Sequence, residues 1–127
     1  MRLVAAAAMI VALAGADPPA ALAQGASAFD GTWSGTGTLT RRQGAGTACG
    51  PDTTDRRFTI RNGQIDFPYD TRYGVTFSGP IAADGSFSIS SGGNSFIGRA
   101  TGSTVTATYS GRQCVREFQF RRRAGAG

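Results

Sequence analysis

Few side chains in this chain of 127 residues are suited to catalysis. Histidine is absent, and Cys49 and Cys114 are the only thiols, so the common catalytic triads cannot be assembled. Two cysteines without histidine also fail to complete a tetrahedral zinc site. Carboxylates remain, and seven of the eight Asp and Glu residues follow residue 23: Asp30, Asp52, Asp55, Asp66, Asp70, Asp84 and Glu117.

Most of these carboxylates lie in turns or beside arginine, where Asx-turn and capping roles account for them. Asp84, directly before Gly85, is typical of a tight turn. The glycine-rich stretches 44–46 and 92–93 are not followed by helical patterns, so they do not indicate a phosphate-binding loop. We therefore expect a protein without enzymatic activity, metal or cofactor.

The two cysteines predict one disulfide in an oxidising compartment. They lie 65 residues apart, and closing a loop of that length stabilises a fold by roughly 4 kcal/mol in the chain-entropy estimate. The N-terminus supports export, because Arg2 precedes an apolar stretch too short for a membrane span and Ala-Leu-Ala at 21–23 matches a signal-peptidase site. We expect a signal peptide at 1–23, a single domain at 24–127 and a location in the periplasm or medium.

All thirteen basic residues are arginine, and the net charge is +5. A basic exported surface can meet anionic lipids, acidic polysaccharide or a negatively charged protein. A nucleic-acid partner is not expected, since the arginines are scattered and the chain is exported. No stretch after the signal peptide is apolar enough to span a membrane, and no oligomeric state is indicated.

The elements that must position these groups are strands, because apolar residues recur with period two after residue 30. Asn62-Gly63 between two alternating stretches is the strongest hairpin signal, since a type I′ turn needs positive φ at both central residues. Further tight turns are predicted at 84–85, 102–103 and 111–112. Alternation predicts strands at 32–40, 58–61, 65–67, 73–77, 86–90, 104–109 and 114–120, with 95–101 ambiguous about which face is buried.

This pattern predicts an all-β fold, an eight-stranded antiparallel up-and-down barrel with one disulfide. A small two-sheet sandwich is the alternative. In the barrel the longer connections share one end, here called the mouth, with both cysteines: 43–55, 68–72, 91–95 and 110–113. The short connections share the other end, here called the floor: 62–63, 84–85 and 102–103.

Gly31-x-Trp33 on a first strand, the eight-strand pattern and an Arg-bearing last strand resemble the calycin barrels, the lipocalins and avidins. This resemblance implies that Trp33 closes the floor and that an arginine from the last strand packs over it. Pairing the first and last strands sets Trp33 opposite residues 119–122, which favours Arg122 for a cation–π contact. The alternative is that 121–123 is a solvated basic tail.

Alternation along the last strand places Arg116 on the same face as Phe118 and Phe120, inside the barrel, where an unpaired guanidinium is costly. Asp66 can pair with it, or the guanidinium can face water or an anionic ligand. Candidate ligand contacts at the mouth are Tyr69, Tyr73, Phe96, Tyr109 and Arg116. Against a hollow barrel, the inward phenylalanines are expected to fill a lumen of this size: Phe58, Phe67, Phe77, Phe87, Phe118 and Phe120.

Three functions stay open. The first is an exported, non-catalytic binding protein for a small apolar or anionic ligand at the mouth. The second is an inhibitor of a protease or lysozyme acting through the segment 41–57, which carries paired arginines at both ends and a cysteine in its middle: Arg41, Arg42, Arg56 and Arg57. Bacterial inhibitors of metalloproteases and of lysozyme are similar in architecture. The third is a purely structural envelope protein.

Overall fold

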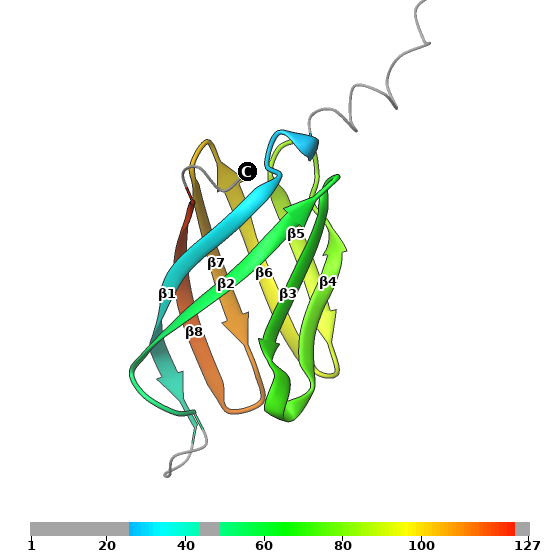
Figure 1. Cartoon of the computed structure of the whole chain (residues 1–127). Helices are drawn as coiled ribbons and strands as arrows, with labels where there is room; N and C mark the ends of the chain where they lie inside the picture. The colour runs from blue at the N-terminus through cyan, green and yellow to red at the C-terminus, as the bar shows by residue number, and fades with distance from the viewer. Residues whose placement is uncertain (1–25, 44–48, 124–127) are drawn as a thin grey trace, which may run out of the picture.

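The computed structural model describes residues 26–43 and 49–123, and the predicted signal peptide lies outside these residues. Eight antiparallel strands form a nearly closed barrel (Figure 1). A short 3₁₀ turn, η2 (Thr71–Tyr73), follows the third strand. The strands are β1 (Gly31–Arg42), β2 (Thr53–Arg61), β3 (Gln64–Asp70), β4 (Val75–Pro80), β5 (Ser86–Ser91), β6 (Asn94–Thr101), β7 (Thr104–Ser110) and β8 (Cys114–Arg122).

A single sheet runs in the order β4-β3-β2-β1-β8-β7-β6-β5, which confirms the barrel and excludes the two-sheet sandwich. The first and last strands are neighbours, with Trp33 opposite Arg122. No ladder joins β4 to β5 within the described residues. These two strands instead approach through side chains and a turn: a Cβ on Gly79 would lie 3.1 Å from Ile89 Cγ1, and Ala82 N–H donates to Ser86 O at 2.9 Å.

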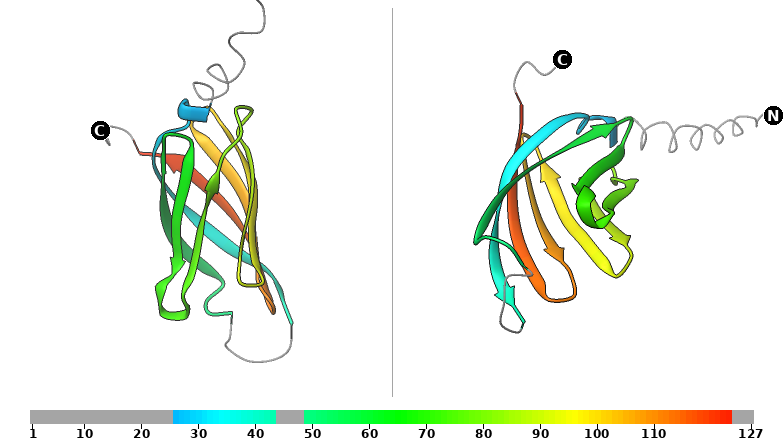
Figure 2. Two further views of the ribbon diagram at one scale, coloured as in Figure 1. Left: turned by 90° about the vertical axis from the view of Figure 1, so that its right-hand side faces the viewer. Right: turned by 60° about the horizontal axis from the view of Figure 1, so that its bottom comes forward.

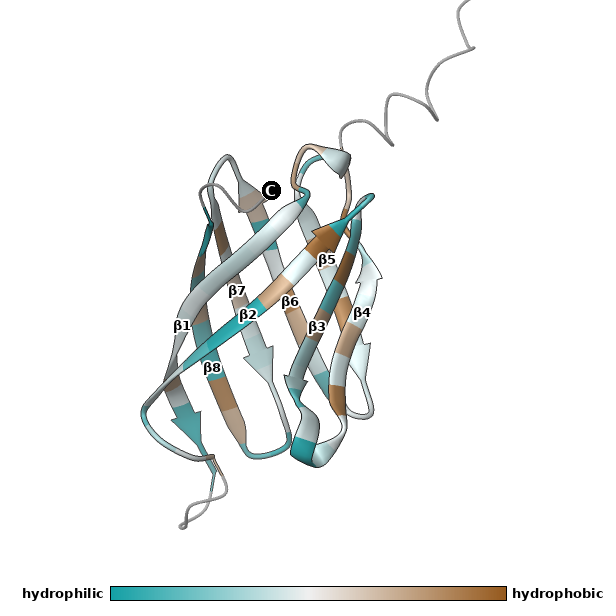
Figure 3. Ribbon diagram, viewed as in Figure 1, coloured by the Kyte–Doolittle hydropathy of each residue, from teal (hydrophilic) through white to brown (hydrophobic). Residues whose placement is uncertain are grey.

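Aromatic side chains fill the barrel from the floor to its middle. Alternate residues of each strand point inward, as period two requires. The rings touch in tilted and edge-on pairs, including Phe58–Phe120 with centroids 4.7 Å apart and Phe67–Phe96 at 4.9 Å. Apolar residues alternate with polar ones along most strands, whereas β1 is pale over much of its length (Figure 3). The aromatic residues with an exposed fraction of at most 1% are Trp33, Phe58, Phe67, Phe77, Phe96, Phe118 and Phe120.

The predicted floor is present. The Arg122 guanidinium carbon lies 4.8 Å from the centroid of the Trp33 ring, and the same guanidinium donates to the carbonyl oxygens of Asp30 and Ala28 at 3.1 Å and Gly102 at 3.0 Å. Trp33 Nε1 donates to Phe29 O at 3.1 Å. Arg122 therefore belongs to the floor and is not part of a solvated tail.

The predicted hairpin at 62–63 is also confirmed. Asn62 has φ of 53° and Gly63 has φ of 74°, the left-handed values that a type I′ turn needs. The Asp30 carboxylate accepts hydrogen bonds from both backbone N–H groups, at 2.7 and 3.0 Å. The turn is thus joined to the segment that enters β1.

Two local predictions need correction, and one open assignment is decided. Tyr73 was expected to begin a strand, but Asp70 accepts a hydrogen bond from Arg72 N–H at 3.1 Å and caps η2, which leaves Tyr73 76% exposed. The ambiguous segment is β6, with Phe96 inside and Ile97 outside. The mouth connection predicted at 43–55 is shorter, because β2 begins at Thr53, whereas the end of β1 at Arg42 agrees with the predicted start of the connection.

Candidate functional site: a basic cavity at the mouth

A cavity of about 640 Å³ opens at the mouth of the barrel, the end turned forward in Figure 2 (right). Side chains from the disulfide-bonded connection and from both halves of the sheet surround it. The lining residues used below are Thr54, Arg56, Tyr69, Asp70, Arg72, Tyr73, Asn94, Tyr109, Arg112 and Arg116.

Two stacked tyrosines separate this cavity from the packed core. The rings of Tyr69 and Tyr109 lie with centroids 4.3 Å apart and planes 14° from parallel. Tyr69 also meets Phe67 and Phe118 edge-on, on the side of the core. The Tyr109 hydroxyl donates to Asn94 Oδ1 at 3.4 Å. A ligand at the mouth would therefore rest on an aromatic base and would not enter the lower barrel.

Both tyrosines keep their protons well above neutral pH. Burial raises the pKa of Tyr69 to about 12, and the nearby Tyr109 adds to this, whereas the charges of Arg56 and Arg116 act in the opposite direction. Burial is also the main cause that raises the pKa of Tyr109, with a contribution from Asp70. The Tyr69 hydroxyl can consequently donate a hydrogen bond at the base of the cavity, and the Tyr109 hydroxyl donates to Asn94 Oδ1.

Arg56 faces the inside of the barrel, although it was expected in a surface loop. Inward residues of β2 alternate, so Arg56 shares a face with Phe58 while Arg57 points outward. Arg56 Nε donates to Tyr69 O at 2.9 Å, and its guanidinium carbon lies 4.9 Å from the centroid of that ring. Further bonds to Thr54 Oγ1 and Asp55 O hold the group in place.

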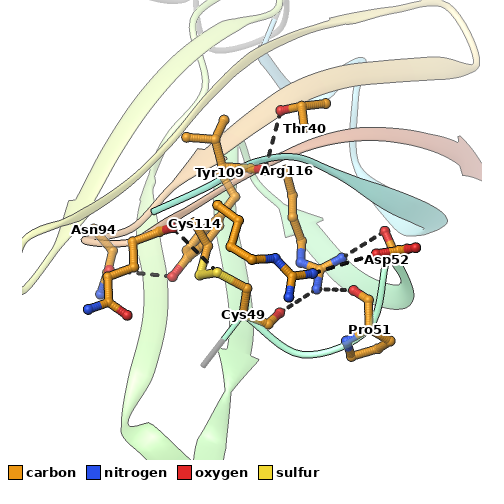
Figure 4. Close-up of a disulfide and its surroundings, with 11 residues drawn as sticks. Thr40, Cys49, Pro51, Asp52, Asn94, Tyr109, Cys114 and Arg116 are labelled. Atoms are coloured by element: carbon orange, nitrogen blue, oxygen red, sulfur yellow. Dashed lines mark hydrogen bonds and ion pairs between the residues drawn. A yellow bond between two sulfur atoms is a disulfide. The ribbon is translucent and has the colours of Figure 1, made fainter. Parts of the chain in front are cut away.

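Arg116 is 3% exposed and is held by backbone carbonyl groups. Its guanidinium donates to Cys49 O at 2.6 Å, to Pro51 O and to Asp52 O, as the dashed lines of Figure 4 show. The prediction that Asp66 pairs with Arg116 is wrong, because Asp66 is exposed on the outer face of β3. Carbonyl groups are present in every residue and leave no sequence signal, which is why these acceptors were missed.

The disulfide between Cys49 and Cys114 is present and lies beside this guanidinium (Figure 4). Cys114 is the first residue of β8, two positions before Arg116. The covalent bridge and the guanidinium therefore hold the same segment, residues 49–52, at the edge of the cavity. The predicted link between the first mouth connection and the last strand is confirmed.

Positive charge dominates the lining of the cavity, where four arginines meet one carboxylate. That carboxylate, Asp70, lies 3.6 Å from Arg72 Nε and also caps η2. Within the described residues, Arg56, Arg112 and Arg116 form no ion pair. Arg72 and Arg112 are exposed and lie at the rim, so their donors can reach a bound molecule. Sequence reasoning missed both, although the Asp70-Thr-Arg stretch carried a turn signal.

The other candidate residues lie elsewhere. Phe96 belongs to the core and has no exposed surface. Arg41 lines a separate hollow of about 160 Å³, and Arg42 pairs with Asp52 at 3.6 Å. Arg57 lies on the outside of the barrel. The inhibitor hypothesis stays a prediction, because residues 44–48 of its segment lie outside the described chain.

Comparisons with family models, with curated proteins and with solved structures found no match to this chain. Among the described residues, no group of three or more Cys, Asp or Glu side chains is placed to hold a metal ion. No helix in that part of the chain is long and apolar enough to cross a membrane.

Proposed function

We propose that this chain is an exported, non-catalytic binding protein that takes a small anionic ligand into the basic mouth cavity. The observation that carries the proposal is the convergence of Arg56 and Arg116 on one cavity without a carboxylate to neutralise either. A buried cation without a counterion is costly, and an anionic ligand would supply the missing charge.

The two kinds of arginine have different parts in this proposal. Arg56 and Arg116 are held by fixed acceptors, so they supply a positive potential that costs no reorganisation when the ligand arrives. Arg72 and Arg112 are exposed and can turn onto a carboxylate, phosphate or sulfate group in a bidentate geometry. The tyrosine pair supports the ring or apolar body of the ligand.

Packing of the lower barrel restricts the ligand to the mouth. The phenylalanines below Tyr69 leave a shallow site, which suits a small molecule better than a long hydrocarbon chain. The floor formed by Trp33 and Arg122 supports a calycin-like assignment, and the disulfide is compatible with export.

Calorimetric titration with aromatic anions tests this function. Benzoate and phenyl phosphate are the probes, and neutral benzamide is the matched uncharged compound. We expect the anions to bind in the millimolar range or tighter, and benzamide about tenfold more weakly or worse, since one decade is about 1.4 kcal/mol.

Neighbouring arginines of β2 provide a matched pair of variants. Arg56→Gln removes the inward charge and should weaken anion binding by about tenfold. Arg57→Gln removes an outward charge one residue away and should leave the affinity within about twofold. Equal effects of the two substitutions, or no anion binding by the native protein, would overturn the proposal.

A further inference from the structure

A second feature lies on the outside of the barrel, where the small side chains of β1 form a strip rich in hydroxyl groups. Ser34, Thr36 and Thr38 point outward from this strand. Two grooves of about 500 and 480 Å³ flank the strip, and Ser34, Gly35 and Thr36 line both. The pale colour of β1 in Figure 3 reflects these small, weakly polar residues.

Three outward arginines surround one end of this strip. Arg57 on β2 and Arg121 on β8 are both register partners of Ser34, one on each side. Arg123 N–H donates to Thr32 O at 2.9 Å, which sets Arg123 beside the next outward residue of β1. All three side chains are exposed, and none forms an ion pair within the described residues.

Ser34 at the centre of this cluster needs a hydrogen-bond acceptor. Its Oγ is buried and has no partner among the described residues. The guanidinium groups on either side can only donate, so they cannot accept the hydroxyl proton. An anionic oxygen bound between the arginines would satisfy this hydroxyl once the exposed arginine side chains turn towards it.

The carboxylates of this face lie nearer the mouth and are already engaged. Asp55 accepts from Thr36 Oγ1 at 2.8 Å, and Glu117 accepts from Thr108 Oγ1 at 2.8 Å. The floor half of the strip is therefore basic. The large exposed apolar residues of the described chain, Tyr73 and Ile97, line neither groove, so nothing there would enter a lipid layer.

We propose that this face, made by β2, β1 and β8, binds an acidic polysaccharide whose carboxylate or sulfate groups lie between Arg57, Arg121 and Arg123. Two strand spacings separate Arg57 from Arg121, roughly 10 Å between their backbones, so successive charged groups of one extended chain can meet both. Ser34 Oγ donates to one of these charged groups, and the Thr hydroxyls bond to the sugar hydroxyls along the strip.

Affinity measurements with an alginate oligomer and a heparin fragment test the proposal and separate carboxylate from sulfate recognition. Arg57→Gln/Arg121→Gln should weaken binding of one or both by at least about tenfold. Arg41→Gln/Arg99→Gln removes the same charge from exposed positions elsewhere and should change the affinity by less than about threefold. Ser34→Ala should weaken binding a few-fold while the protein stays folded.

Equal losses in the two double variants would overturn the proposal in favour of non-specific charge. Equally tight binding of duplex DNA or of vesicles containing an anionic lipid would overturn it too, as would native protein that binds neither polysaccharide. Binding of phenyl phosphate at the mouth should be unchanged in Arg57→Gln/Arg121→Gln, so failure of this surface and failure of the mouth site are distinguishable.

Discussion

Arg122 and Arg116 lie six residues apart on β8 and make comparable contacts at opposite ends of the barrel. Each guanidinium donates to three or more backbone carbonyl groups of segments that cross one end. At the floor the acceptors lie beside Trp33, whose ring fills the space under Arg122. At the mouth three acceptors belong to residues 49–52 and a fourth is Gly37 O of β1, and a cavity remains beside them. The same guanidinium–carbonyl hydrogen bonds close the floor and border an opening at the mouth.

The difference comes from what packs beneath each guanidinium. A buried indole occupies the floor, whereas the mouth has two stacked tyrosines with polar hydroxyls and further cations around them. A structural arginine is neutralised by carbonyl dipoles and a π face. At the mouth four arginines and one carboxylate line the cavity, and this excess of positive charge is the reason to expect an anion there.

The largest effect should come from breaking the floor. Trp33→Ala removes a fully buried indole and should lower the free energy of unfolding by about 3–5 kcal/mol. Urea denaturation followed by circular dichroism measures the loss. Tyr73→Ala, at an exposed position, serves as the control and should stay within about 0.5 kcal/mol. A loss below about 1 kcal/mol for Trp33→Ala would contradict the described floor.

Removing the disulfide at the mouth should lower the free energy of unfolding somewhat less than the loss of Trp33. Cys49→Ser/Cys114→Ser opens a covalent loop of 65 residues and should lower the free energy of unfolding by about 2–4 kcal/mol. Binding of phenyl phosphate should weaken as well, because residues 49–52 lose their covalent attachment to β8. Trp33 fluorescence of the folded variant should be unchanged, since the indole lies at the other end. A shifted emission would show that the two ends are coupled.

Matched substitutions on β8 sharpen the comparison directly. Arg116→Met and Arg122→Met each remove charged hydrogen bonds and should lower the free energy of unfolding by about 1.5–3 kcal/mol. The readouts should then separate: Arg116→Met weakens anion binding, and Arg122→Met shifts Trp33 fluorescence. If both variants moved both signals, the division between a closed end and a binding end would be wrong.

Gly63 in a floor turn and Gly93 in a mouth turn both have positive φ, so alanine substitutions there compare the two turns. At the floor, a Cβ on Gly63 would lie 2.9 Å from Ala26 Cβ, whereas at the mouth Gly93 has nothing within 4 Å. Gly63→Ala should lower the free energy of unfolding by about 1–2 kcal/mol, and Gly93→Ala by about 1 kcal/mol from backbone strain alone. Thermal denaturation of both variants measures the difference, and a larger loss for Gly93→Ala would reverse the expected order.

The last prediction concerns Tyr69 in the mouth, whose titration should change the free energy of unfolding only at alkaline pH. Its pKa in the folded protein, about 12, exceeds the ordinary value of 10.0, so the folded state holds the phenolic proton more tightly than the unfolded state. The resulting stability is fully present below about pH 10 and is lost as the pH rises towards 12. Tyr69→Phe should flatten this part of the pH profile of unfolding. An unchanged slope in the variant would assign the loss to another group.

The sequence by itself determined most of the strands and the hairpin, whereas the floor was predicted from the resemblance to calycin barrels. Period-two alternation needs no knowledge of distant contacts, and Asn62-Gly63 between two alternating stretches favours left-handed backbone at both residues. Two cysteines allow one disulfide. Strand register then placed Arg122 opposite Trp33. The alternation counted back from Phe58 also contains the inward direction of Arg56.

Only the tertiary structure decided which contacts the residues of the mouth make. The carbonyl acceptors of Arg116 are backbone groups common to all residues, and they converge because a disulfide folds residues 49–52 over β8. The Asp70 cap of η2 competed locally with the strand expected at Tyr73. The unpaired edges of β4 and β5 depend on how the whole sheet twists and closes. Alternation along a chain records which residues are buried, whereas the charge around an opening depends on segments that meet only after folding.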